Sequence, residues 1–450
     1  MSATLISGGH LIDPSQSIDG PRDLLLIDGR VSEVGEPGSF GAAHSRNAEV
    51  RNAEVIDARG LIVTPGLIDI HVHLREPGQG YKETIATGTR AAAAGGFTSV
   101  AAMPNTIPVN DSPELTRWMQ APERDAAIRV FPIAAATQGS LGETLNDYAA
   151  LKAAGAFAVS DDGKPILGDE TMLRTLERAA EAGLPVIQHA EDTRLTGGCS
   201  MNAGPVAFRL GLRGMPVEAE AGIVERDIRL LADINEPRAH LHVAHLSTER
   251  ALNHVRRAKD RGFHVTCEVT PHHFVLTEAA VEGYNTQAKM NPPLRSAADR
   301  QAMLQGLLDG TIDCIATDHA PHAAHEKEQE FERAPNGITG LETVLGLALA
   351  VLHREHGLPL SRVLALLNMQ PSRILDLPGR GTLAAGAFAD VVLIDPQAVW
   401  TFRAQNSRSR SKNTPFDGWP MLGAVHTTIS EGRIVYRNQG VSSDPTYPSS

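Results

Sequence analysis

The hydrophobic positions of this chain follow one pattern at its two ends and another between them. Near the N-terminus, short apolar runs alternate with Gly and Asp turns, as in DLLLIDGRVSEVG at 23–35. The same style returns near the C-terminus in TTISEGRIVYRNQG at 427–440. Runs of this kind are typical of short antiparallel strands. We therefore expect residues 1–62 and 372–450 to form one small β domain from two separate segments.

Between these segments, apolar runs of strand length alternate with longer stretches of helical period. Eight strands are expected, at 67–73, 97–105, 128–137, 156–163, 185–192, 240–248, 264–273 and 312–322. Helices are expected at 83–95, 169–183, 248–262 and 298–310. This α/β alternation predicts a (β/α)8 barrel over 63–371, with an open doubly wound sheet as the alternative. The barrel is favoured because chemically capable side chains recur at the C-terminal strand ends, where barrels carry their active sites.

One irregularity interrupts the N-terminal strands. The string NAEVRNAEV at 47–55 repeats four residues within a polar stretch. We expect it to be a loop insertion and assign it no function.

Composition narrows the class of protein. The hydrophobic share of 42% and charged share of 21% are those of a globular protein, and no apolar run reaches the roughly 20 residues that cross a bilayer. The start of the chain lacks the basic and apolar regions of a secretory signal. Three separated cysteines fit a reducing compartment, so we expect a cytoplasmic protein. A net charge of −12 argues against nucleic acid as a partner.

Histidine and aspartate recur at the ends of the expected strands. His71 and His73 are two residues apart on the first strand, so their side chains share a face. Four other strand ends carry further candidates: Asp161 and Asp162, His189, His245, and Asp318. Any one of these alone is more often a surface acid or a satisfied core histidine. Together they suit zinc, and because they exceed one tetrahedral shell, we expect two metals that share an aspartate.

Seven motifs stand out along the chain: GLIDIHVHLREPG at 66–78, MPNT at 103–106, SDDG at 160–163, HVAHLST at 242–248, EVTPHH at 268–273, KMNPPLR at 289–295 and TDHAPH at 317–322. Together they resemble the signature of the dihydroorotases, in the amidohydrolase superfamily, and are most similar to the long bacterial class I enzymes. The motifs run in the family's order across the whole barrel, and the similarity extends into both terminal β segments.

The resemblance implies a centre of two zinc ions per subunit. Its ligands would be His71, His73 and Asp318 for one ion, His189 and His245 for the other, and Asp162 with a hydroxide between both. Spacing alone does not decide between Asp161 and Asp162, and only the family pattern selects the second. His242 is expected to be a packing residue, and His272 and His273 are expected to support the site or the fold.

The resemblance also implies a substrate pocket formed by Arg75, Asn105, Asn291 and His322. A guanidinium presents a planar pair of donors to a carboxylate, which lysine matches poorly, although Arg75 could instead form a structural salt bridge. The loop APNGITG departs from the family because Asn336 stands where an aromatic residue is common. That departure concerns the contacts of the loop and leaves the metal chemistry unaffected.

The implied reaction is the reversible cyclisation of N-carbamoyl-L-aspartate to L-dihydroorotate in de novo pyrimidine synthesis, with Asp318 transferring the proton. Two alternatives remain open. Hydantoinases and allantoinases usually bridge their metals with a carboxylated lysine at the end of strand four, whereas here Lys164 falls beyond the aspartates. A non-catalytic relative would hold aspartate transcarbamoylase subunits together but would lack metal ligands. A homodimer is expected, with aspartate transcarbamoylase as a further candidate partner and no membrane association.

Overall fold

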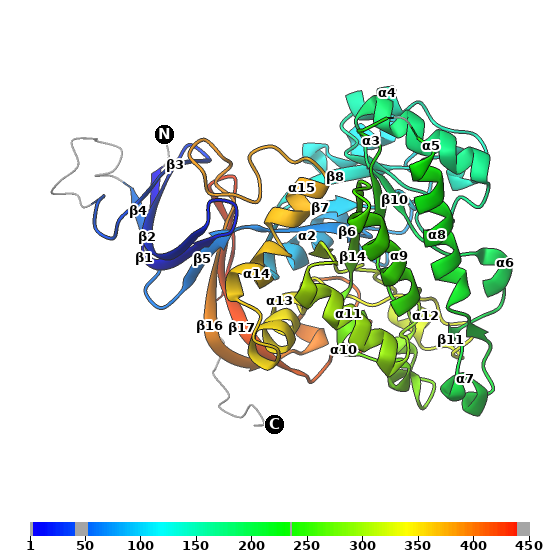
Figure 1. The fold of residues 1–450 in the computed structure, drawn as a ribbon. Coiled ribbons are helices and arrows are strands. Elements are labelled where there is room, and N and C mark those ends of the chain that lie inside the picture. The colour runs from blue at the N-terminus through cyan, green and yellow to red at the C-terminus, as the bar shows by residue number, and fades with distance from the viewer. Residues whose placement is uncertain (1–2, 41–52, 235, 439–450) are drawn as a thin grey trace.

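Eight parallel strands form one sheet of the computed structural model, which describes residues 3–40, 53–234 and 236–438 (Figure 1). In spatial order they are β15 (Cys314–Ile315), β14 (Val265–Val269), β13 (Leu241–Val243), β10 (Val186–Gln188), β9 (Ala158–Val159), β8 (Arg129–Ala134), β7 (Phe97–Ala102) and β6 (Leu67–Val72). The ends of this row meet, since Val72 forms a parallel bridge with His319 and His73 N donates to His319 O at 2.9 Å. The sheet is thus a nearly closed barrel, as predicted, and the open doubly wound alternative is wrong.

Each of the eight predicted strands contains one of these barrel strands. Most strand residues are buried, including all of β6 and β7, because helices cover the strands from outside and their own side chains fill the interior. Several are only two or three residues long, since the polar residues that follow them leave the ladder and line the barrel mouth.

Helices between the strands cover the barrel. They include α2 (Ile85–Ala94), α3 (Pro113–Met119), α4 (Tyr148–Ala153), α5 (Asp169–Ala182), α8 (Glu218–Ala232), α9 (Glu249–Asp260), α11 (Ala297–Asp309), α13 (Val344–Ala348), α14 (Leu360–Ala365) and α15 (Met369–Ile374). The four predicted helices are α2, α5, α9 and α11. Their ends follow local chemistry: the Thr248 side chain caps α9, and Gly183 ends α5 in the left-handed conformation at φ 67°. No helix in the described ranges is long and apolar enough to cross a membrane.

The two ends of the chain form the second sheet, which lies beside the barrel and is coloured blue, orange and red in Figure 1. Its strands are β1 (Ala3–Asp13), β2 (Ile18–Ile27), β3 (Arg30–Gly35), β4 (Glu54–Asp57), β5 (Ile62–Pro65), β16 (Val391–Thr401), β17 (Pro420–Ser430) and β18 (Arg433–Arg437). This small sheet was expected to be antiparallel throughout, which is wrong in one respect. Both β4 and β5 pair parallel to β1, from which β2 and β3 separate them in the sequence, whereas tight turns join the antiparallel neighbours β1, β2 and β3.

The repeated string at 47–55 falls partly outside the described residues, which exclude 41–52. Its last two residues, Glu54 and Val55, belong to β4 and pair with Thr4 and Leu5 of β1. The expectation of a loop insertion is therefore wrong for these two residues, which belong to a strand.

Candidate active site

The six candidate metal ligands converge at the C-terminal end of the barrel. His71 lies in β6, and the others follow the ends of β6, β9, β10, β13 and β15: His73, Asp162, His189, His245 and Asp318. All are buried. Ligand atoms within 4.8 Å of one another define three overlapping groups, which are His71–His73–Asp162, His71–His245–Asp318 and Asp162–His189–His245. Parallel strands produce this convergence because their carboxyl ends open onto one face of the barrel.

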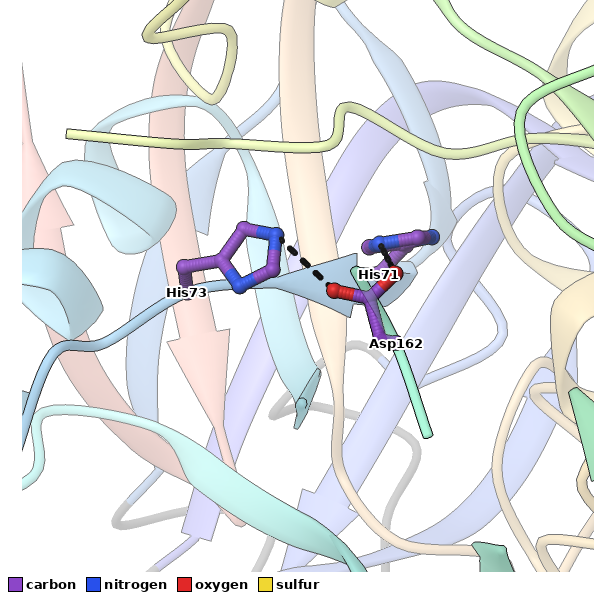
Figure 2. Close-up of side chains that lie close together, drawn as sticks. All are labelled: His71, His73 and Asp162. Carbon is purple, nitrogen blue, oxygen red and sulfur yellow. Dashed lines mark ion pairs between the residues drawn. The ribbon is translucent and has the colours of Figure 1, made fainter. Parts of the chain in front are cut away.

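Asp162 occupies the middle of this cluster. Its Oδ1 lies 3.6 Å from His71 Nε2 and 3.6 Å from His189 Nδ1, and its Oδ2 lies 3.7 Å from His73 Nε2. Figure 2 shows the carboxylate directed at His71 and His73, with one oxygen toward each. The neighbouring Asp161 turns away and accepts hydrogen bonds from the backbone N–H and hydroxyl of Thr137. Of these two neighbouring aspartates, Asp162 is the one that faces the histidines.

An unpartnered nitrogen shows that these residues fit a metal. His71 Nε2 is fully buried, has no hydrogen-bond partner among the described residues, and lies 3.6 and 3.7 Å from oxygens of Asp162 and Asp318. Buried polar atoms are rarely left unsatisfied, so such an atom needs an explanation. Imidazole nitrogens and carboxylate oxygens that converge on one point form a donor set suited to zinc.

Two carboxylates that the sequence did not single out lie behind the ligands. Glu268 Oε1 is 2.6 Å from His71 Nδ1, and Glu191 Oε2 is 2.9 Å from His189 Nε2. Such a carboxylate fixes the tautomer and orientation of a ligating imidazole. Their places in EVTPHH and HAED, at the ends of two strands, were the available signal. His242, expected only to pack, also hydrogen bonds to Glu268 Oε2 at 3.1 Å.

The electrostatics of the cluster keep its carboxyl groups ionised. Burial alone would raise the pKa of Asp318, but the charge of His71 and the contact with His73 outweigh burial and lower this pKa to about 2. Burial likewise opposes ionisation of Asp162, yet the neighbouring imidazoles of His189, His245 and His71 hold its pKa well below the usual range. The barrel mouth therefore holds carboxylates that can bind a cation or accept a proton.

A cavity of about 190 Å³ opens above the cluster and brings the four candidate substrate residues together. Its lining contains Arg75, Asn105, Asn291 and His322 beside His73, Asp162, His189, His245 and Asp318. Asn336 also lines it, so the residue that departs from the family pattern faces the same space.

Hydrogen bonds orient these four side chains. Asn105 Nδ2 donates to Asp162 Oδ2 at 2.9 Å, and Asn291 Nδ2 donates to Glu191 Oε2 at 2.8 Å. Arg75 Nε donates to Pro321 O at 3.1 Å, and its Nη2 lies 3.4 Å from His322 Nε2. Arg75 pairs with no carboxylate among the described residues within ion-pair distance, so its guanidinium remains available to an anion.

Two remaining histidine predictions and the lysine alternative can be placed as well. His273 is buried and bridges Thr270 Oγ1 and Pro292 O, which is a structural arrangement, and His272 is buried next to it. Lys164 is exposed and is not among the residues that line the cavity.

Comparison with known proteins gives relatives along nearly the whole chain. A family model described as Dihydro-orotase-like matches residues 60–251. The chain is 51% identical over 433 residues to the dihydroorotase of Geotalea daltonii, covering 96% of this chain and 99% of that protein. It is 50% identical over 434 residues to the dihydroorotase of Geobacter metallireducens, with the same coverage.

Solved structures share the fold at lower identity. The L-hydantoinase (dihydropyrimidinase) from Arthrobacter aurescens superposes with a TM-score of 0.85 at 25% identity, covering 98% of this chain and 97% of that one. A D-hydantoinase gives a TM-score of 0.82 at 22% identity, covering 99% and 97%. These structures support the barrel with its accompanying sheet. Their sequence identity to this chain is about half that of the dihydroorotases.

Proposed function

The chain belongs to the dihydroorotase family, and on that premise we propose that it is a zinc-dependent dihydroorotase. It interconverts N-carbamoyl-L-aspartate and L-dihydroorotate, a step of pyrimidine biosynthesis. The observation that carries the proposal is the single cavity in which the buried His/Asp cluster faces Arg75, Asn105, Asn291 and His322.

The proposed centre holds two zinc ions. His71, His73 and Asp318 would hold one, His189 and His245 the other, and Asp162 would lie between them. The unpartnered Nε2 of His71 and the overlapping ligand groups support this assignment. When bound, zinc polarises a carbonyl oxygen and lowers the pKa of water from about 16 toward about 7.

Asp318 would move the proton of the reaction. Its pKa, lowered to about 2, leaves it a carboxylate that can accept a proton from the attacking water. The same oxygen can then deliver that proton to the ring nitrogen as the amide bond of dihydroorotate breaks. Ring closure uses these steps in reverse, so one side chain serves both directions.

Arg75 and the two asparagines would bind and orient the substrate. The guanidinium of Arg75 can donate two parallel hydrogen bonds to the substrate carboxylate. Asn105, Asn291 and His322 offer hydrogen-bonding groups around the same cavity, where they can bind the ring. The enclosure of the reacting atoms by these groups fixes their geometry, which is the usual source of a large rate gain.

The alternatives have less support. A hydantoinase or allantoinase usually has a bridging lysine, but Lys164 is exposed and does not line the cavity. A non-catalytic partner of aspartate transcarbamoylase would lack ligands, whereas all six candidates converge here. We further propose that the protein is a cytoplasmic homodimer and that aspartate transcarbamoylase is an additional partner. Light scattering of the purified protein, with and without that enzyme, tests both the dimer and the association.

The direct test is ultraviolet-monitored hydrolysis of L-dihydroorotate by the zinc-loaded protein, with hydantoin and allantoin as comparison substrates and zinc measured in each sample. We expect strong preference for dihydroorotate and two zinc ions per chain. Asp318→Asn should abolish both hydrolysis and cyclisation. Faster turnover of hydantoin, or substantial activity in Asp318→Asn with its zinc retained, would contradict the proposal.

A further inference from the structure

A loop of the small sheet reaches across to the mouth of the barrel. It connects β16 and β17, and its residues 409–413, here named the strap, contact the segment that follows β6. Ser411 Oγ donates to Lys82 O at 2.6 Å, and Arg410 N donates to Glu83 Oε1 at 3.0 Å. Ser409 also hydrogen bonds to Glu83. The strap is therefore held against the barrel by several independent hydrogen bonds.

Asn413, at the end of the strap, joins two barrel loops. Its side chain is buried, with 3% of the residue exposed. Its Oδ1 accepts from His322 N at 2.9 Å, while its Nδ2 donates to Ala320 O at 3.0 Å and to Gly337 O at 2.9 Å. Its own backbone carbonyl accepts from Thr339 N at 2.8 Å. One side chain thus satisfies three buried backbone groups on two segments.

Both segments carry side chains of the substrate cavity. The first contains His322, and Pro321 O accepts the hydrogen bond from Arg75 Nε at 3.1 Å. The second contains Asn336, which lines the cavity beside His322. The segments touch, because a β-carbon added to Gly337 would lie 2.6 Å from His322 Cδ2. A shift of either segment would move cavity groups directly.

A lysine holds the second segment from the other side. Lys327 Nζ donates to Pro335 O at 2.9 Å and to Gly337 O at 3.1 Å. Gly337 O therefore accepts from two donors. Among the described residues, the His322 N–H donates only to Asn413 Oδ1. Loss of the Asn413 side chain should loosen the His322 segment more than the Asn336 segment.

We propose that Asn413 is a positioning residue through which the small sheet fixes the substrate-binding side chains His322 and Arg75. Its hydrogen bonds set the backbone of residues 320–322, from which both groups are aligned. The identity of the substrate rests on the proposed function, while the positioning role itself rests on the contacts described above.

Three variants of the full-length, zinc-loaded protein test this role. Asn413→Ala removes all three side-chain hydrogen bonds, and Asn413→Asp keeps the acceptor for His322 N but replaces the two donated bonds with a repelling oxygen. Asn368→Ala is the matched control, because Asn368 is also buried and bonded to backbone but lies at the opposite end of the barrel, beside Thr64 and Pro65. The readouts are KM and kcat for L-dihydroorotate, zinc content, Tm, and hydrogen exchange of peptides covering 316–340.

We expect Asn413→Ala to raise KM about tenfold or more, with zinc content unchanged and kcat less affected. Exchange of the 316–340 peptides should accelerate. Asn413→Asp should also raise KM but should keep more protection near His322, and Asn368→Ala should lower Tm without moving KM or this exchange.

The role is wrong if both Asn413 variants lower Tm but keep the wild-type KM and exchange, as the control does. It is also wrong if KM rises only in proportion to lost zinc. Absence of dihydroorotate turnover in the wild-type protein would defeat the proposed function instead, and the exchange comparison would then decide the positioning role by itself.

Discussion

Histidines flank strand β13 at both ends of the barrel, but their electrostatic surroundings differ. At the C-terminal end, His245 Nε2 lies 2.9 Å from His189 Nδ1 and 3.9 Å from Asp162 Oδ1. At the N-terminal end, His240 stacks on His264 with ring centroids 4.0 Å apart. Both ends are thus rich in histidine, but only the first supplies carboxylates between the imidazoles.

The protonation of these histidines follows from their neighbours. Burial, then repulsion from His264 and His242, lowers the pKa of His240 to about 2. Burial acts in the same direction on His189, but hydrogen bonds to Asp162 and Glu191 outweigh it and raise the pKa to about 10. The two ends of the barrel thus differ in what surrounds their histidines, because carboxylates contact His189 whereas other imidazoles surround His240.

The backbone at the C-terminal end of the barrel has an unusual feature. His245, Asp318 and Arg75 adopt positive φ values of 31°, 44° and 61°, which are uncommon for residues other than glycine. All three are at the C-terminal end of the barrel, directly after strands. Strained conformations of this kind are retained where the surrounding structure enforces them, typically at functional sites.

The largest expected loss of activity comes from replacing Asp162, and replacing the adjacent Asp161 should have a different effect. Asp162→Ala should lose most of one metal and reduce kcat/KM on the order of a thousandfold or more, because the shared carboxylate is gone. Asp161→Ala should instead cost about 1–3 kcal/mol of stability, since it leaves Thr137 groups unpaired, and should keep its metal. Metal analysis and steady-state kinetics of both variants decide this, and zinc loading should need no bicarbonate. Two bound zincs and full activity in Asp162→Ala would contradict the bridge.

The next largest expected effect is a rise in KM when Arg75, the proposed partner of the substrate carboxylate, is replaced. Arg75→Lys keeps the charge but loses the planar pair of donors, so KM for dihydroorotate should rise roughly tenfold to a hundredfold with zinc unchanged. Arg59→Lys is the control, because Arg59 is exposed and pairs with Asp57 on the small sheet. An unaltered KM in Arg75→Lys would show that the substrate carboxylate is bound elsewhere.

A smaller effect tests the carboxylate behind His71. Glu268→Gln should weaken zinc affinity about tenfold, because the amide no longer fixes and polarises the imidazole as a carboxylate does. Competition with a zinc chelator measures this. Asp390→Asn provides the comparison, since Asp390 is an equally buried carboxylate that pairs with Arg380 outside the barrel mouth. Equal zinc affinity in Glu268→Gln and wild type would remove Glu268 from the site.

The smallest effect concerns the opposite end of the barrel and is a stability change. His240 stays neutral in the folded protein down to about pH 2, whereas in the unfolded chain it binds a proton below the ordinary histidine pKa of about 6.5. The unfolded state then holds more protons, so stability falls as pH drops through this window, by up to about 1.4 kcal/mol per pH unit. Urea unfolding between pH 5 and 8 should show a shallower fall for His240→Gln, with little change in KM. Identical pH slopes would show that His240 does not contribute.

Much of the site could be predicted because strand geometry is local. Alternation along one strand places His71 and His73 on the same face, and parallel strands bring Asp162, His189, His245 and Asp318 to one end. The parallel pairing of β4 and β5 with β1 escaped prediction, because strand direction depends on where a connection returns rather than on the pattern within the strand.

The sequence by itself therefore determined the barrel, the strand that carries each candidate ligand, and the family. Tertiary structure alone decided that Asp162 rather than Asp161 faces the histidines, and that Glu268 lies against His71 across 197 residues of sequence. It also brought Asn413 of the small sheet to His322, 91 residues away. The physical reason is that the periodicity of a strand or helix determines which face each side chain occupies. Which residues far apart in the sequence come into contact depends instead on how the folded elements pack together.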